Sequence, residues 1–90
     1  MQKHIDYKVK GGKLLRIRVR LDKGTIKGIK ITGDFFIYPE EGIFEIEKAL
    51  KGINIKDIKD MLDKTIRSKK IRIIGFGSKD VVDALNLLKK

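Results

Sequence analysis

The sequence predicts an α+β fold in which a three-stranded antiparallel sheet packs one face against helices. Apolar and polar residues alternate over residues 1–33, as in half-buried strands, and the apolar residues after residue 42 repeat at helical spacing. Nine glycines among 90 residues supply the turns between these segments. We therefore expect one domain over 1–90, built as a two-layer sandwich.

Three segments are predicted as strands of an antiparallel meander. HIDYKVK ends at the turn GGK, LLRIRVRL ends at the turn DKGT, and IKGIKIT follows. Ile26 is out of phase with its neighbours, so we expect a β-bulge near Gly28. Alternation places one set of side chains inward: Ile5, Tyr7, Val9, Leu15, Ile17, Val19, Leu21, Ile29 and Ile31.

Helical spacing begins after Gly33. Pro39 suits the first position of a helix, and Gly52 fits its end. Asn54 and Ser78 are candidate N-caps of two further helices, and KKIRII between these is a candidate short fourth strand or an extended link. The expected inner stripes are Ile43, Ile46, Ala49 and Leu50, then Ile55, Ile58, Met61, Leu62, Thr65 and Ile66, then Val81, Val82, Leu85 and Leu88.

The composition argues against catalysis by this chain alone. Without cysteine it can form neither a disulfide nor a thiolate metal site. The single histidine, His4, lies near the N-terminus, where chains are commonly poorly ordered. The acids of IKDIKDMLDK alternate with lysines as on a solvated helix face, and GFGS lacks the spacing of a phosphate-binding loop. We expect a non-catalytic chain that binds no metal or cofactor by itself.

No apolar run follows Met1, and no apolar stretch approaches the roughly 20 residues of a membrane span. We therefore expect a cytoplasmic protein without a membrane partner.

The net charge of +10 is segmental. Residues 1–33 carry ten Lys and Arg against two acids, residues 34–63 carry four against eight, and residues 64–90 carry eight against two. The outward side of the sheet is expected to be basic and could bind nucleic acid, keep the chain soluble, or dock an acidic protein. The aromatic residues of a base-stacking sheet are missing there. The predicted basic face comprises Lys8, Lys10, Arg16, Arg18, Arg20, Lys27 and Lys30.

The segment ITGDFFIYPEE holds more large side chains than one core face can take. Phe35, Phe36, Ile37 and Tyr38 are consecutive, and successive residues of a strand point in opposite directions. One of the two phenylalanines is expected to fill the layer between sheet and helices, and at least one aromatic is expected to stay at the surface. An exposed aromatic cluster usually marks contact with another protein.

The run GGKLLRIRVRLDKGT followed by IKGIKITGDFFIYPEEGIFEIEKALKGINI resembles the C-terminal accessory domain of lipoate–protein ligases, especially the version encoded as a separate small subunit in archaea. The resemblance covers about Gly11 through Leu62. It rests on the order of a basic hairpin, the strand end IxGDFF, an acidic helix start and the helix end ExxLxG.

The resemblance implies a non-catalytic subunit that forms a heterodimer with the catalytic subunit of the ligase. The complex would use ATP, Mg and lipoate to make lipoyl-adenylate, then modify lysines in lipoyl domains of 2-oxoacid dehydrogenases or glycine-cleavage proteins. The contacts expected with the catalytic subunit are Gly33, Asp34, Phe35, Phe36, Tyr38 and Pro39, and Lys13 and Arg16 are candidates to reach phosphates or an acidic rim of the partner. The alternative is a stand-alone basic nucleic-acid-binding domain.

Overall fold

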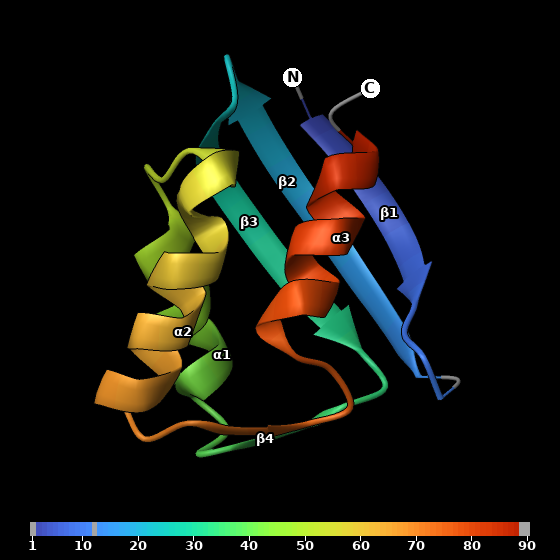
Figure 1. Cartoon of the computed structure of the whole chain (residues 1–90), viewed down its shortest axis with the longest axis vertical. Helices are drawn as coiled ribbons and strands as arrows, with labels where there is room; N and C mark the ends of the chain where they lie inside the picture. Colours follow the sequence, from blue (N-terminus) through green and yellow to red (C-terminus); the bar gives the residue numbers. More distant parts are fainter. Residues whose placement is uncertain (1, 12, 89–90) are drawn as a thin grey trace.

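The computed structural model describes residues 2–11 and 13–88 and confirms the predicted α+β fold (Figure 1). The main sheet is antiparallel, in the order β1-β2-β3, with bounds β1 Gln2–Lys8, β2 Leu14–Asp22 and β3 Thr25–Gly33. The helical layer comprises α1 Gly42–Leu50, the 3₁₀ turn η1 Ile55–Asp57, α2 Ile58–Ser68 and α3 Ser78–Leu88. The helices lie on one face of the sheet, as the figure shows.

The apolar core lies between these two layers. Along β2, the inward residues Leu15, Ile17 and Val19 are at most 1% exposed, and the arginines between them face solvent. A fully buried aliphatic side chain stabilises the fold by about 1.5–3 kcal/mol, so this layer supplies the main driving force. The helices contribute fully buried Ile46, Leu50, Ile58, Leu62, Val81 and Leu85.

The expected bulge is present in β3. Gly28 pairs with Arg20, and Ile26 pairs with Leu21, which leaves Lys27 as the extra residue. The extra residue shifts the phase of the strand by one position, so that Ile26 returns to the core side and is fully buried.

The outer edge of β3 is covered by α1 and by the segment that follows it. The Ile31 N–H donates to Glu47 Oε2 at 2.8 Å, and the Ile26 N–H donates to the Ile53 carbonyl at 2.9 Å. An uncovered strand edge tends to pair with other chains, so these contacts protect the sheet on this side.

A second, two-stranded sheet lies at the end of the molecule where β3 finishes (Figure 1). Strand β4 (Phe36–Tyr38) pairs antiparallel with β5 (Arg72–Ile74), with Phe36 opposite Ile74 and Tyr38 opposite Arg72. The candidate fourth strand therefore exists, but it pairs with the aromatic segment instead of extending the meander.

The prediction that Pro39 begins the first helix is wrong. Residues 39–41 form a turn in which the Gly42 N–H donates to the Pro39 carbonyl at 2.8 Å, and α1 begins at Gly42; the Tyr38–Pro39 peptide bond is cis. Pairing with β5 keeps the chain extended through Tyr38, and a residue before proline disfavours helical geometry. The helix can begin only after the turn.

The two predicted N-caps have different outcomes. Asn54 accepts a backbone N–H of η1 at 3.1 Å, as a cap should, at the turn that leads into α2. Ser78 is the first residue of α3 and not its cap: the preceding Gly77 N–H donates to Asp80 Oδ2 at 2.7 Å. The Ser78 side chain instead lies beside Asp63 of α2, where it lowers the pKa of that carboxylate.

Candidate protein-interaction site

The chain leaves the main sheet through a turn that requires glycine. Gly33 has φ +146°, and a Cβ at this position would overlap the Leu14 carbonyl oxygen. The same oxygen accepts the Asp34 N–H at 2.8 Å. Gly33 thus permits the turn, and Asp34 fixes it through its backbone, which sets the direction of the aromatic residues that follow.

The two phenylalanines after this turn diverge. Phe35 is half-buried and meets Phe76 edge-on, with ring centroids 4.8 Å apart and an interplanar angle of 83°. Phe36 is 75% exposed, and Tyr38, two residues further on the same side of β4, is 74% exposed. The prediction that at least one aromatic stays at the surface is confirmed.

These rings belong to an exposed apolar cluster. Ile74 lies directly opposite Phe36 on β5 and is 68% exposed, while Ile37 and Ile73 form the half-buried pair on the other side of the small sheet. We refer to Phe36, Tyr38 and Ile74 as the aromatic patch. Exposed apolar clusters of this kind are typical of surfaces that contact other proteins.

A groove of about 470 Å³ adjoins the aromatic patch. The amine of Lys13 and the carboxylate of Asp34 give it charges of both signs, and the Phe36 ring belongs to both the groove and the patch. Its lining is Lys13, Gly33, Asp34, Phe35 and Phe36, all of which the sequence singled out.

Arg16 does not line this groove. It lies on the open face of the main sheet, where its Nε is 3.5 Å from Asp6 Oδ1, and it lines a separate hollow with His4 and Arg18. The structure therefore assigns the two predicted cations, Lys13 and Arg16, to different surfaces. His4 is part of β1, opposite Arg18, and not part of a frayed terminus as expected.

Three exposed apolar residues escaped the sequence interpretation: Phe44, Ile74 and Leu87. Phe44, 64% exposed, lies on α1, which contacts β4. Helical spacing alone places it off the inner stripe of Ile43 and Ile46, so the signal was present. Ile74 is exposed because β5 pairs with β4, and this long-range pairing leaves no mark in the local pattern.

The described residues include no group of three His, Asp or Glu side chains that could hold a metal ion, and no buried side-chain N or O atom without a hydrogen-bond partner. The hydrogen bond from Ser78, followed by the one from Lys59, lowers the pKa of Asp63 below its ordinary 3.8. This group belongs to the contact between α2 and α3 and not to the groove. None of the described helices has the length and apolar character needed to cross a bilayer.

Fold and surface together define a class: a small α+β domain whose aromatic rings are exposed at one end beside a groove. A family model described as "Bacterial lipoate protein ligase C-terminus" matches residues 2–85, and the chain belongs to this family. The match confirms the resemblance inferred from the residues and extends it toward both ends of the chain.

A named relative and a solved structure, both from Thermoplasma acidophilum, are similar to this chain. A relative named "Lipoate-protein ligase A subunit 2" is 34% identical over 83 residues, covering 92% of this chain and 86% of the relative. A solved chain from "an archaeal lipoylation system", described as "a bi-partite lipoate protein ligase and its E2 lipoyl domain", superposes with a TM-score of 0.81. It is 33% identical, and 94% of each chain is covered.

Proposed function

We propose that this chain is the non-catalytic accessory subunit of a bipartite lipoate–protein ligase. With a separate catalytic subunit it acts in the ATP-dependent activation of lipoate to lipoyl-adenylate, before transfer to a lysine of a lipoyl domain in the cytoplasm. Support comes from the family match over residues 2–85 and from the similarity, along nearly the whole chain, to a protein named as the second subunit of such a ligase.

The observation that carries the proposal is the aromatic patch beside the groove. Phe36, Tyr38 and Ile74 are each at least two-thirds exposed, although transferring each side chain out of water would be favourable. Docking against the catalytic subunit would bury them, with Pro39 held half-buried in the turn that follows. Aromatic side chains supply a disproportionate share of binding energy at interfaces, and the patch is therefore assigned to the heterodimer contact.

The chemistry explains what a non-catalytic subunit contributes. The lipoate carboxylate attacks the α-phosphorus of ATP and pyrophosphate leaves; the acceptor lysine Nζ then attacks the acyl carbon of lipoyl-adenylate and AMP leaves. The intermediate is an acyl-phosphate anhydride that water hydrolyses, so a subunit that closes over it and excludes water protects the yield.

Within this proposal the catalytic subunit holds ATP, Mg and lipoate. Lys13 is the cation placed at the groove, where it can reach a phosphate or an acidic rim of the partner. Asp34 at the same groove would pair with a partner cation. The accessory subunit thus shapes and closes the site without taking part in bond making.

Reconstitution tests the proposal. The chain alone should consume no ATP, and adding the catalytic subunit should give lipoate-dependent pyrophosphate release faster than the catalytic subunit gives by itself. An equal rate of lipoyl-adenylate formation by the catalytic subunit with and without this chain would refute the activating role.

A further inference from the structure

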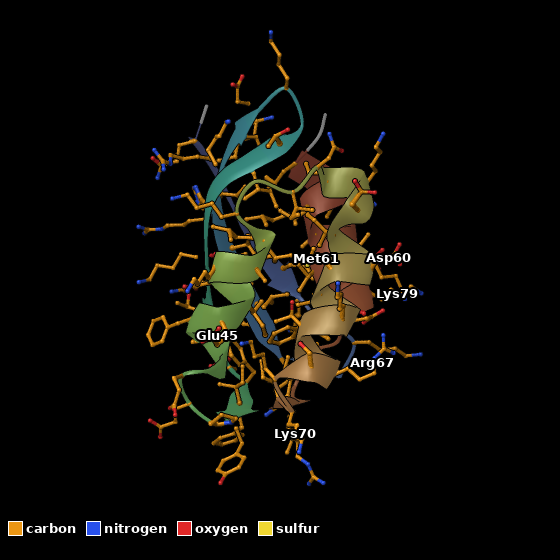
Figure 2. The ribbon with its side chains drawn as sticks, turned by 90° about the vertical axis from the view of Figure 1, so that its left-hand side faces the viewer. Glu45, Asp60, Met61, Arg67, Lys70 and Lys79 are labelled. Carbon is orange, nitrogen blue, oxygen red and sulfur yellow. The ribbon has the colours of Figure 1, made fainter. Side chains whose placement is uncertain are left out.

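The open face of the main sheet gathers positive charge in register. Across the three strands, His4 pairs with Arg18 and Arg18 with Lys30, so that these side chains form one row on the same face. Arg16 and Arg20 lie on either side of Arg18 along β2. Figure 2 shows nitrogen-tipped side chains projecting from the sheet on the side away from α2 and α3.

Little of this charge is neutralised within the chain. Among the residues that the structure describes, the sheet face has one ion pair, Arg16 with Asp6, and both side chains are more than half exposed. The other described ion pair, Lys59 with Asp63, lies on α2. The outer side of the helical layer, by contrast, carries both signs, as Asp60, Arg67 and Lys79 show (Figure 2).

The row of cations costs the isolated chain stability. Like charges directly opposite on neighbouring strands repel, and Arg18 faces Lys30 in this way. An anionic ligand on this face would offset the repulsion between Arg18 and Lys30, and its binding would be strengthened by attraction to each unpaired cation. The arrangement is therefore unfavourable for folding and favourable for binding a negatively charged surface.

The shape of the face suits an extended ligand. One hollow of about 410 Å³ is lined by His4, Arg16, Arg18 and Lys30, and the next, of about 290 Å³, follows along the strands toward Arg20. Nine residues of β2 extend over about 30 Å. All of these side chains are exposed, so the face resembles a docking surface more than an enclosed pocket for one small anion.

Protein carboxylates fit this face better than a nucleic acid. None of the outward side chains of β1, β2 and β3 in the described part is Phe, Tyr or Trp, so the face lacks the large aromatic side chains on which single-stranded bases usually stack. Asp6 lies among the cations and would repel a phosphate backbone, whereas on a protein partner it can pair with a lysine.

We propose that the open sheet face docks an acidic protein domain, and that this domain is the acceptor whose lysine receives the lipoyl group. The identification of the acceptor rests on the proposed function. The aromatic patch lies on β4 and β5, not on this face. The chain can therefore bind the catalytic subunit through the aromatic patch and the acceptor through the open sheet face.

The test uses the assembled ligase and measures activation and transfer separately. Two variants neutralise or reverse the row: Arg18→Gln/Lys30→Gln and Arg18→Glu/Lys30→Glu. The matched control, Lys64→Glu/Lys79→Glu, makes the same charge change as the Glu variant, but on the helical layer. We expect lipoyl-adenylate formation within about two-fold of wild type in all three. We also expect the KM for the acceptor to rise about ten-fold or more in the sheet variants alone, with a weaker dependence on salt than in wild type.

An unchanged KM in the sheet variants, with adenylate formed normally, overturns the docking surface and leaves the proposed function standing. The proposal is also overturned, in favour of nucleic acid, if wild type binds a DNA or RNA oligonucleotide more tightly than the acceptor at physiological salt and the sheet variants lose that binding. If wild type supports no adenylate formation, the proposed function fails. In that case poly-L-glutamate is titrated into the chain to test whether the open sheet face is a docking surface for carboxylates. Loss of binding in the sheet variants alone supports the docking surface, and equal binding by the sheet and control variants refutes it.

Discussion

Phe36→Ala should weaken the complex with the catalytic subunit far more than it destabilises the chain. Phe36 is 75% exposed, and a buried aromatic covers about 150–250 Å², so folding buries about 50 Å² of this ring. At about 25 cal/mol per Å², its removal costs about 1 kcal/mol of folding free energy. Burying the remaining three-quarters in an interface is worth about 2–4 kcal/mol, which corresponds to a Kd weaker by about 30- to 1,000-fold.

The neighbouring Phe35→Ala is the contrasting variant. Phe35 is half-buried and packs edge-on against Phe76, so its loss leaves a partial cavity and costs about 2–3 kcal/mol of folding free energy. Leu87→Ala removes a 53% exposed apolar residue on α3 and controls for nonspecific effects on binding. Urea unfolding of each isolated chain and calorimetric titration with the catalytic subunit separate the two quantities. If Phe36→Ala lowers the folding free energy as strongly as Phe35→Ala but leaves the Kd unchanged, the ring belongs to the core and the assignment of the patch is refuted.

Gly33→Ala should destabilise the chain by about 2–4 kcal/mol in urea unfolding, because it combines an unfavourable φ with overlap on the Leu14 carbonyl oxygen. Gly52→Ala is the control, because Gly52 also has a positive φ, +89°, but has open space around it. If Gly52→Ala lowers the folding free energy as much as Gly33→Ala does, overlap with the Leu14 carbonyl contributes nothing at Gly33. Ser78→Ala should raise the pKa of Asp63 toward 3.8 in an NMR titration. The change should lower the folding free energy by less than about 1 kcal/mol, because the Asp63 side chain is 37% exposed and water can replace the hydroxyl. An unchanged pKa of Asp63 would contradict the hydrogen bond from Ser78. Because the folded-state pKa of Asp63 is lowered, its contribution to stability is present above 3.8 and is lost as the pH falls through the lower folded value. The stability difference between wild type and Asp63→Asn should accordingly shrink below pH 3.8 in acid-range unfolding curves, and a difference that grows would reverse the sign of the argument.

The sequence was sufficient for features that depend on local pattern. Strict alternation in LLRIRVRL predicted the buried face of β2, and the phase error at Ile26 predicted the bulge. The four adjacent large residues after Asp34 predicted that some aromatic surface would remain exposed. Each of these follows from the period of a strand, which a single segment displays without help from the rest of the chain.

Features that depend on distant partners could not be predicted in the same way. The start of α1 at Gly42 follows from the pairing of Phe36–Tyr38 with Arg72–Ile74, segments far apart in the sequence. The role of Ser78 depends on Asp63 lying within reach on α2. Lys13 and Arg16 lie on different surfaces because their side chains line different hollows. Their closeness in the sequence suggested that they would share one site.

The most direct measurement of the central claim is hydrogen–deuterium exchange of this chain, free and bound to the catalytic subunit. Strands β4 and β5 are three residues each and form a two-stranded sheet, so their amides should exchange readily in the free chain. We predict strong protection on binding over residues 33–38 and Arg72–Ile74. Protection confined to the outer side of α2 and α3, with β4 and β5 unchanged, would contradict the account.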